Sequence, residues 1–252
     1  MKISFVILIF FILGLSLFIN KQTFTNIKKA PKILHLVLFS HDNGAYDMMY
    51  QLTRKFYKSF PNVTTYYYCF NPNIKDVSVH DDILYIKGDE GYIPNILDKT
   101  IKAFEYFNTK IDYDYIVRSN ISTVIDFNLL TEKIEKDKPS YGGPYSTLNW
   151  LDPNGGIVDK TYFGLKFVTG TSIILSKKLI KKILENKHKI NYNIIDDVAI
   201  GLLIRDHIPT PITMYNNDFT EKYNENAIFY RNRSSDRYND VKNMRKIIKR
   251  IR

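Results

Sequence analysis

Apolar and polar residues alternate along the chain in blocks that predict strands followed by helices. Residues 32–39 are almost continuously apolar, which predicts a buried strand, and this strand ends in the polar loop 40–44. In residues 46–60, apolar and aromatic side chains recur with the three-to-four spacing of an amphipathic helix. Residues 64–70 are rich in β-branched and aromatic side chains, which favours a second strand, and residues 83–86 predict a short third one.

The same order continues through the middle of the chain. Residues 95–107 have the apolar spacing of a helix, and residues 113–118 predict a strand that stops at the polar run 119–122. A charged helix near residues 129–136 and a loop rich in Gly and Pro at residues 141–145 are expected next.

Strand–helix–strand alternation predicts parallel pairing, because neighbouring parallel strands need a crossover connection. We therefore expect one α/β domain with a mostly parallel central sheet over residues 32–214. In such sheets, ligands bind beyond the carboxyl ends of the strands. The predicted strand ends fall at Ser40, at residues 118–120 and near Gly170, so polar residues gather where a ligand is expected.

The N-terminal pattern predicts a membrane anchor. Residues 3–19 carry no charge, and as a helix they would span roughly 26 Å, which is adequate for a thin bilayer. A cleaved signal peptide is the competing interpretation, but no small-residue cleavage site follows. We expect an uncleaved signal anchor, a transmembrane helix over residues 1–20, followed by a polar, Lys-rich stem over residues 21–31.

Charge does not settle the orientation of this anchor, because lysines flank it on both sides. Three N-glycosylation sequons, at Asn62, Asn120 and Asn232, would permit a glycoprotein, although so Asn-rich a chain readily produces them by chance. We expect a single-pass type II protein whose folded domain is lumenal or extracytoplasmic. The solitary Cys69 forms no intramolecular disulfide and does not identify the compartment.

Composition adds one asymmetry to this picture. The 252 residues are 44% hydrophobic and 25% charged, which is ordinary for a globular protein. The formal net charge is +10, and residues 231–252, with nine Arg or Lys and two acids, contribute +7 of it. The rest of the chain is close to neutral, which argues against nucleic acid as a partner.

The basic C-terminal extension, residues 215–252, ends in a predicted amphipathic helix. Val241, Met244, Ile247, Ile248 and Ile251 recur with helical spacing, opposite Lys and Arg. Such a helix would lie on an anionic membrane, dock on the folded domain or end as a frayed tail. The sequence leaves these alternatives open.

Asp196 and Asp197 are adjacent carboxylates in an otherwise apolar stretch. Ionised carboxylates are costly beside a hydrophobic core unless they are paired, liganded or used in chemistry. One interpretation of the pair is therefore catalytic. The other is structural, because both carboxylates would be stabilised at the start of an amphipathic helix that packs Val198 and Leu202 inward.

Four segments, taken in order, resemble the β-1,3-galactosyltransferase and Fringe-like glycosyltransferases. Residues 95–100 are similar to the family's Asn-Leu-Thr-Leu-Lys-Thr, and residues 115–119 to the Tyr-Leu-Leu-Lys-Thr strand that leads into its DxD motif. Residues 168–176 are similar to its Gly-rich segment that ends in a strand and Ser, and residues 196–201 to its Glu-Asp-Val-x-x-Gly. The order and spacing of these segments carry the resemblance, which covers residues 93–209.

The resemblance implies a GT-A-like nucleotide-binding fold. It also implies inverting transfer of a sugar from a nucleotide diphosphate sugar donor to a glycan or glycoprotein acceptor. The family's base maps onto Asp197, which would deprotonate the acceptor hydroxyl as it attacks the anomeric carbon. At the donor we expect six further residues: Lys99, Arg118, Asn120, Ser122, Gly170 and Asp196.

The chain departs from the family at the DxD site. Asn120 and Ser122 stand where aspartates are expected. The family's metal-ligating His lies well downstream of its catalytic Asp, but no His follows His207 here. Both departures argue against a Mn²⁺ or Mg²⁺ site. Lys99 and Arg118 would then supply positive charge in the metal's place.

Each donor residue also has a structural alternative. Lys99 and Arg118 would form surface ion pairs, and residues 120–122 would form a strand-end turn or a glycosylated sequon. Gly170 would either let the backbone approach the sugar closely or form a bulge in a buried strand.

We therefore expect a membrane-anchored glycosyltransferase, a hexosyltransferase. The first rival is a catalytically inactive glycan- or nucleotide-binding relative, which the missing DxD aspartates favour. The second is a membrane-tethered basic interaction protein, which would require the polar residues at the strand ends to be scattered in space.

Overall fold

The computed structural model describes residues 29–212, 214–217 and 227–252. The chain divides into Met1–Ala30 and Pro31–Arg252, and the second unit contains all the elements described below. The predicted transmembrane helix and residues 21–28 of the predicted stem lie outside the described residues. Among the helices that the structure does describe, none is long and apolar enough to cross a membrane.

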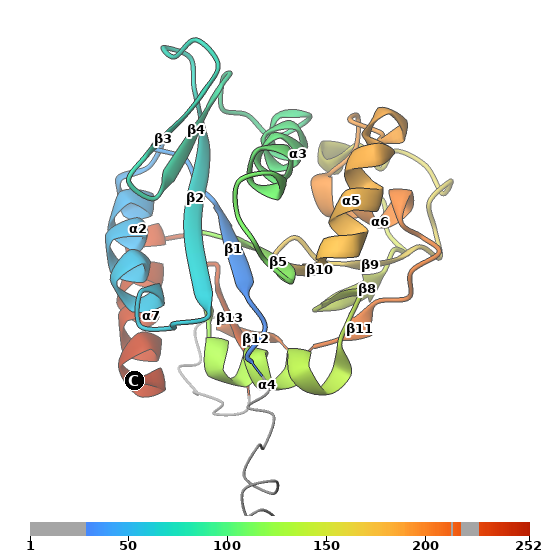
Figure 1. The fold of residues 1–252 in the computed structure, drawn as a ribbon. Helices are drawn as coiled ribbons and strands as arrows, with labels where there is room; N and C mark the ends of the chain where they lie inside the picture. Colours follow the sequence, from blue (N-terminus) through green and yellow to red (C-terminus); the bar gives the residue numbers. More distant parts are fainter. Residues whose placement is uncertain (1–28, 213, 218–226) are drawn as a thin grey trace, which may run out of the picture. The chain divides into compact units, whose positions relative to one another are not determined.

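Eight strands of the described chain form the central sheet (Figure 1). In spatial order they are β11 (Thr210–Pro211), β7 (Tyr141–Gly143), β10 (Ser172–Ser176), β5 (Tyr115–Asn120), β1 (Ile33–Leu38), β2 (Val63–Asn71), β4 (Ile83–Lys87) and β3 (Val77–His80). β1 pairs in parallel with β2 and β5, β2 with β4, and β7 with β11, while the other three pairings are antiparallel. The predicted α/β fold with a mostly parallel central sheet is confirmed.

Two amphipathic helices connect the parallel strands. α2 (Gly44–Tyr57) joins β1 to β2, and α3 (Asn95–Asn108) lies between β4 and β5 in the chain. The buried face of α2 includes Met49, Thr53 and Phe56, at the spacing from which this helix was predicted. Because each helix returns the chain to the start of the next strand, β1, β2 and β5 all end at the same edge of the sheet.

Helices cover both faces of the sheet and enclose two hydrophobic cores. One core contains side chains of α2, α4 (Phe127–Asp137) and α7 (Arg237–Ile251). The other contains side chains of α3, α5 (Lys177–Glu185) and α6 (Asp196–Leu203). In Figure 1, α2 and α7 lie together on one side of the sheet, while α3, α5 and α6 lie on the other.

The C-terminal helix α7 docks on the folded domain. It packs against α2, β6 (Thr123–Ile125) and β13 (Phe229–Asn232). Four of its apolar side chains are buried, namely Val241, Met244, Ile247 and Ile248, and Ile251 is partly buried against the same core. Because the apolar face is covered by protein, the structure favours the docked helix over the membrane-bound and frayed alternatives.

Two smaller sheets accompany the central one within the described residues. β12 (Met214–Asn217), β13 and β6 form the first, and β8 (Tyr145–Thr147) with β9 (Lys166–Val168) forms the second. Two short 3₁₀ turns, η1 (Pro153–Gly155) and η2 (Lys187–Lys189), lie before β9 and before α6.

The predicted loop at residues 141–145 is wrong, because most of it belongs to β7 and β8. Its glycines lie in β7 and allow neighbouring strands to pack closely against it. Gly143 has a φ of 144°, and a Cβ at this position would lie 2.4 Å from the carbonyl oxygen of Ser172 in β10. A glycine is therefore required inside the sheet, although glycine in a sequence more often indicates a turn.

Candidate active site

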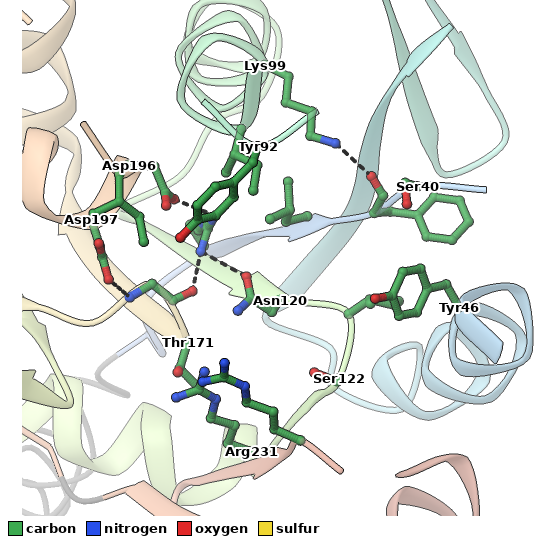
Figure 2. Close-up of a pocket in the computed structure, with 18 of the residues that line it drawn as sticks. Ser40, Tyr46, Tyr92, Lys99, Asn120, Ser122, Thr171, Asp196, Asp197 and Arg231 are labelled. Carbon is green, nitrogen blue, oxygen red and sulfur yellow. Dashed lines mark hydrogen bonds and ion pairs between the residues drawn. The ribbon is translucent and has the colours of Figure 1, made fainter. Parts of the chain in front are cut away.

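A cavity of about 750 Å³ opens at the carboxyl edge of the central sheet (Figure 2). β1 and β5 run in parallel with Leu38 opposite Asn120, so both strands end beside it. β10 is antiparallel to β5, so its start, and the turn at Gly170 and Thr171 before it, reach the same edge. All seven predicted site residues line this cavity: Lys99, Arg118, Asn120, Ser122, Gly170, Asp196 and Asp197.

The gathering of these residues at one cavity tests two of the alternatives that the sequence left open. The hypothesis of a membrane-tethered basic interaction protein required the polar residues at the strand ends to be scattered. They lie together at one cavity, which argues against that hypothesis. Gly170 is not in a strand bulge, because it lies in the turn that the Ser172 N–H closes on the Thr169 carbonyl at 3.3 Å.

Asp197 lies in the first turn of α6 and is only 9% exposed. Its Oδ2 accepts a 2.7 Å hydrogen bond from the N–H of Gly170, and its Oδ1 accepts one of 2.8 Å from the N–H of Val198. Burial, followed by repulsion from the neighbouring carboxylate of Asp196, raises the pKa of Asp197 to about 7. At neutral pH this carboxyl group can therefore both accept and release a proton.

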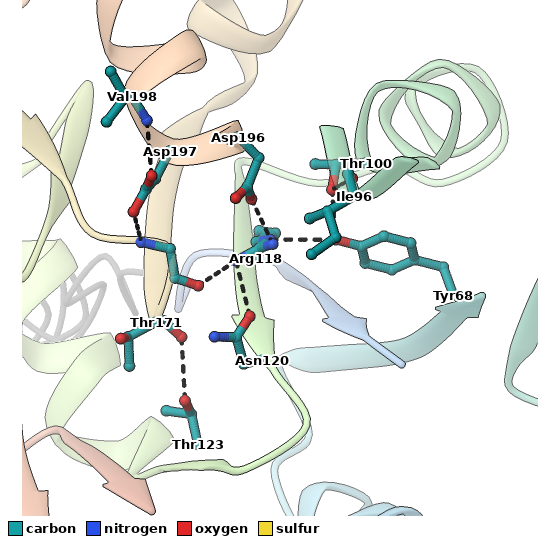
Figure 3. Close-up of polar contacts among 11 residues, drawn as sticks. Tyr68, Ile96, Thr100, Arg118, Asn120, Thr123, Thr171, Asp196, Asp197 and Val198 are labelled. Carbon is teal, nitrogen blue, oxygen red and sulfur yellow. Dashed lines mark hydrogen bonds and ion pairs between the residues drawn. The ribbon is translucent and has the colours of Figure 1, made fainter. Parts of the chain in front are cut away.

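Arg118 in β5 links the segments around Asp197 (Figure 3). Its Nη2 donates a 2.6 Å hydrogen bond to Oδ2 of Asp196, and its Nη1 donates to the Gly170 carbonyl and, at 3.1 Å, to Oδ1 of Asn120. Its Nε donates to the hydroxyl of Tyr68 at 3.3 Å. The side chain is 1% exposed, so the predicted alternative of a surface ion pair is wrong. The donors of Arg118 are directed at protein partners, which makes it a group that positions the site.

Lys99 in α3 is also buried and paired. Its Nζ donates a 3.0 Å hydrogen bond to the Phe39 carbonyl and forms an ion pair with Glu90. Burial lowers the pKa of Lys99, and the charge of Glu90 opposes that shift. The structural alternative for Lys99 was a surface ion pair, but the ion pair is buried. Contact between Lys99 and the nucleotide sugar donor stays a prediction.

Asn120 and Ser122 lie where β5 ends and β6 begins. Oδ1 of Asn120, the atom that would replace a carboxylate ligand, already accepts a hydrogen bond from the cationic Arg118. Asp196, a carboxylate that lines the same cavity, is neutralised by the same guanidinium. Across the described residues, no group of three or more His, Cys, Asp or Glu is placed to hold a metal ion. These residues therefore do not fit the divalent metal site implied by the resemblance.

Other residues that line the cavity had not been identified from the sequence: Tyr46, Tyr92, Asp152, Arg231, Arg233 and Arg237. Tyr92 is 47% exposed, and Figure 2 shows it on the same side of the cavity as Asp196. Burial, and then the charges of nearby carboxylates, raise the pKa of its hydroxyl. The only sequence signal for the arginines is the basic C-terminal run, whose pattern is typical of a helix surface or a tail.

The three sequons differ in accessibility within the folded domain. Asn232 is fully buried, and its Nδ2 donates to the Ser122 carbonyl at 3.2 Å. Asn62 is partly buried, and its Nδ2 donates to the carbonyl oxygen of Pro31 and to Oγ1 of Thr131, each at 3.1 Å. Asn120 lines the cavity.

Comparison with known protein families identifies this domain. The galactosyltransferase family model matches residues 72–213, more than half of the chain. The chain belongs to the galactosyltransferase family. It is therefore a glycosyltransferase, as the order of its motifs predicted, and its relatives use nucleotide sugar donors and glycan or glycoprotein acceptors. The matched region of this galactosyltransferase-family protein contains all seven predicted site residues, whereas Arg231 and Arg233 lie beyond it.

Solved structures that match this chain include three from different sources. A glycosyltransferase involved in the glycosylation of the major capsid of PBCV-1 is 10% identical, with a TM-score of 0.48 over 86% of this chain and 100% of that one. The bifunctional IspDF from Campylobacter jejuni is 15% identical, with a TM-score of 0.42 over 73% of this chain and 50% of that one. The 2-C-methyl-D-erythritol 4-phosphate cytidylyltransferase from Thermus thermophilus is 10% identical, with a TM-score of 0.48 over 86% and 99%.

At these identities and TM-scores, the structural similarity identifies no substrate for this chain. A search of curated protein sequences finds no match.

Proposed function

We propose that this galactosyltransferase-family protein transfers a sugar, with inversion, from a nucleoside diphosphate sugar to a hydroxyl of a glycan or protein, and that Asp197 is the general base. One observation carries the proposal. The Asp197 carboxylate lines the cavity, and its pKa is raised to about 7. A general base is most effective when its pKa lies near the working pH, which an ordinary surface aspartate does not achieve.

In the proposed step, the acceptor hydroxyl oxygen forms a bond to the anomeric carbon while the bond from that carbon to the diphosphate oxygen breaks. The hydroxyl proton passes to a carboxylate oxygen of Asp197. The electron pair of the broken bond leaves with the nucleoside diphosphate. A single displacement of this kind inverts the anomeric configuration.

The surroundings of Asp197 support this role. The N–H groups of Gly170 and Val198 each hold one carboxylate oxygen, which fixes the orientation of the group while lone pairs remain for the proton. Arg118 holds Asp196 beside it, and this second carboxylate keeps the pKa of Asp197 high. The base is thus oriented before the acceptor arrives, which lowers the entropic cost of reaching the reactive geometry.

The residues at the end of β5 suit the nucleotide sugar. Asn120 accepts a hydrogen bond through Oδ1, and within the described residues its Nδ2 makes none. This leaves an amide donor at the cavity for an oxygen of the ribose, sugar or phosphate. Gly170 lets the backbone of the β9–β10 turn come close to the same space, because no side chain intervenes.

We also propose that residues 1–20 anchor the protein in a membrane as a single-pass type II chain, with the domain lumenal or extracytoplasmic. The uncharged run at residues 3–19 supports this topology. Translation of the full chain with microsomes tests it. The chain should resist carbonate extraction and be protected from added protease, and a chain released by carbonate would refute the anchor.

A screen of nucleotide sugars against the full-length protein tests the enzymatic proposal, with transfer and donor hydrolysis measured together. Asp197→Asn should reduce turnover by about 10²-fold or more while leaving nucleotide binding and thermal unfolding close to those of the wild type. Asp206→Asn, at a carboxylate that is exposed and outside this cavity, is the matched control. Full turnover by Asp197→Asn would remove the mechanism. Binding without turnover by the wild type would favour the catalytically inactive relative.

A further inference from the structure

We infer that the leaving diphosphate is neutralised by two arginines at the end of β13, Arg231 and Arg233, in place of a divalent metal ion. We call this pair the β13 arginines. The inference rests on the proposed function, because it concerns how the same cavity binds the nucleoside diphosphate. It differs from the sequence-based expectation, which assigned the replacement charge to Lys99 and Arg118.

The β13 arginines lie alongside the segment that replaces the DxD motif. β13 pairs antiparallel with β6, which places Arg231 opposite Thr123. The next residue, Asn232, donates two hydrogen bonds to the Ser122 carbonyl, from its N–H at 3.0 Å and from its Nδ2 at 3.2 Å. The C-terminal region therefore brings cationic side chains to the place where the family resemblance predicted carboxylates and a metal.

Strand alternation directs both arginines toward the cavity. In extended chain, successive side chains point to opposite faces. Asn232 is fully buried and points into the protein, so its neighbours Arg231 and Arg233 point the other way, and both line the cavity. In Figure 2, Arg231 lies beside Thr171 and Ser122, on the other side of the β9–β10 turn from Asp197. The proposed base and the proposed diphosphate site thus line one cavity of about 750 Å³.

The segment that carries the β13 arginines is held in place at both ends. Asn232 anchors one end to Ser122. At the other end, the fully buried Asp240 accepts hydrogen bonds from the N–H of Ser234 at 3.0 and 3.2 Å and forms an ion pair with Arg237. A site that is ordered before its ligand arrives loses less entropy on binding.

Charge balance distinguishes Arg233 from most other cations of the cavity. Carboxylates already neutralise three of these cations, in the pairs Lys99–Glu90, Arg118–Asp196 and Arg237–Asp240. Arg233 is exposed to the cavity, and within the part of the chain that the structure describes no carboxylate forms an ion pair with it.

The chemistry of the guanidinium group suits this task. It stays charged at any working pH, and its planar array of donors binds phosphate oxygens in pairs. Both arginines lie outside the region matched by the family model, residues 72–213. The positive charge is therefore supplied by the C-terminal part of this chain.

Calorimetric titration of the full-length protein with uridine, guanosine, cytidine and adenosine diphosphates, in EDTA and in Mn²⁺, tests the inference. At least one nucleotide should bind in EDTA with an affinity within about threefold of that in Mn²⁺. Arg233→Ala and Arg231→Ala should each weaken that binding about tenfold or more, and Arg233→Lys should weaken it less. The control is Arg245→Ala, at an exposed arginine of α7 outside the cavity, and it should bind like the wild type. Thermal unfolding of each variant confirms that it folds.

The outcomes separate this inference from the proposed function. Binding that requires Mn²⁺ for every nucleotide would overturn the inference and leave the proposed function standing. Unchanged affinity in both alanine variants would also overturn it. If no nucleotide binds in either condition, the proposed function fails together with the inference.

Discussion

The backbone N–H of Gly170 donates a 2.7 Å hydrogen bond to Oδ2 of Asp197 and so joins the β9–β10 turn to the first turn of α6. Gly170 has no side chain, and the space around its α-carbon is narrow. A Cβ there would lie 3.2 Å from Nη1 of Arg118 and 3.4 Å from the same Asp197 oxygen. Glycine therefore allows the turn, the arginine and the carboxylate to meet at one wall of the cavity.

The pKa of Asp197 predicts the pH dependence of transfer. Only the ionised carboxylate accepts a proton, so kcat/KM should rise with pH and level off above an apparent pKa of about 7. A profile that stays flat from pH 5 to pH 8 would contradict Asp197 as the base.

The raised pKa of Asp197 also makes the stability of the fold depend on pH. Stability should fall as the pH rises, whereas the rate of transfer should increase. The folded-state pKa of Asp197 is raised above the ordinary value of 3.8, so between about pH 4 and pH 7 the native state binds more protons than the unfolded state. The contribution of Asp197 to the free energy of unfolding is thus present at low pH and is lost as the pH rises toward 7. Urea unfolding across this range should show this loss in the wild type and a smaller one in Asp197→Asn.

Replacing Asp196 by Asn should move the pH profile to lower values. Asp196 helps to raise the pKa of Asp197, and its removal also leaves Arg118 without its ionic partner. Both changes stabilise the ionised form of Asp197, so the apparent pKa of transfer should fall. The free energy of unfolding should drop by about 3 kcal/mol, because Arg118 is a buried charge.

The profile of Asp112→Asn, a carboxylate exposed far from the cavity lining, serves as the control. An unmoved or raised apparent pKa in Asp196→Asn would show that the pair is not coupled in the way proposed.

Lys99→Met should reduce stability more than nucleotide affinity. Lys99 is 2% exposed and forms an ion pair with Glu90. Its loss leaves this partly buried carboxylate without an ionic partner, which should lower the free energy of unfolding by about 3 kcal/mol. The double variant Lys99→Met/Glu90→Gln should recover part of that loss, as urea unfolding would measure. Nucleoside diphosphate affinity should change less than about threefold in both. A loss of affinity well beyond this would instead support the sequence-based expectation that Lys99 contacts the donor.

Met244→Ala should destabilise the domain by about 2–5 kcal/mol, because Met244 is fully buried where α7 packs against the rest of the core. Lys242→Ala, at an exposed position two residues earlier, should leave thermal unfolding nearly unchanged. If Met244→Ala unfolded like the wild type but lost affinity for anionic vesicles, the membrane-bound alternative for this helix would replace the docked one.

Periodic segments were predictable from the sequence because their signal is local. The helix predicted at residues 46–60 is α2, and the strand predicted at residues 32–39 is β1, each within a few residues of its observed ends. The glycine-rich strand β7 was missed, because Gly143 is required by a contact with β10, which lies far away in the sequence.

The site was predictable in location but only partly in its interactions. Ligands bind beyond the carboxyl ends of parallel strands, so a site at Asn120 could be expected. Gly170 reaches the same edge for a different reason, because it precedes β10, which is antiparallel to β5. The partners of Arg118 and Lys99 could not be expected, because each ion pair depends on which elements meet across the sheet. The position of the β13 arginines at the cavity could not be predicted for the same reason. It depends on the pairing of β13 with β6, which joins segments about a hundred residues apart.

By itself, the sequence determined the α/β order, the edge of the sheet at which polar residues collect and the pair of carboxylates at the start of α6, because these follow from local periodicity and chain direction. The tertiary structure alone decided that Arg118 and Lys99 are buried and balanced, that α7 docks on the domain and that Arg231 and Arg233 line the cavity. The reason is physical: burial and charge pairing depend on which distant segments pack together.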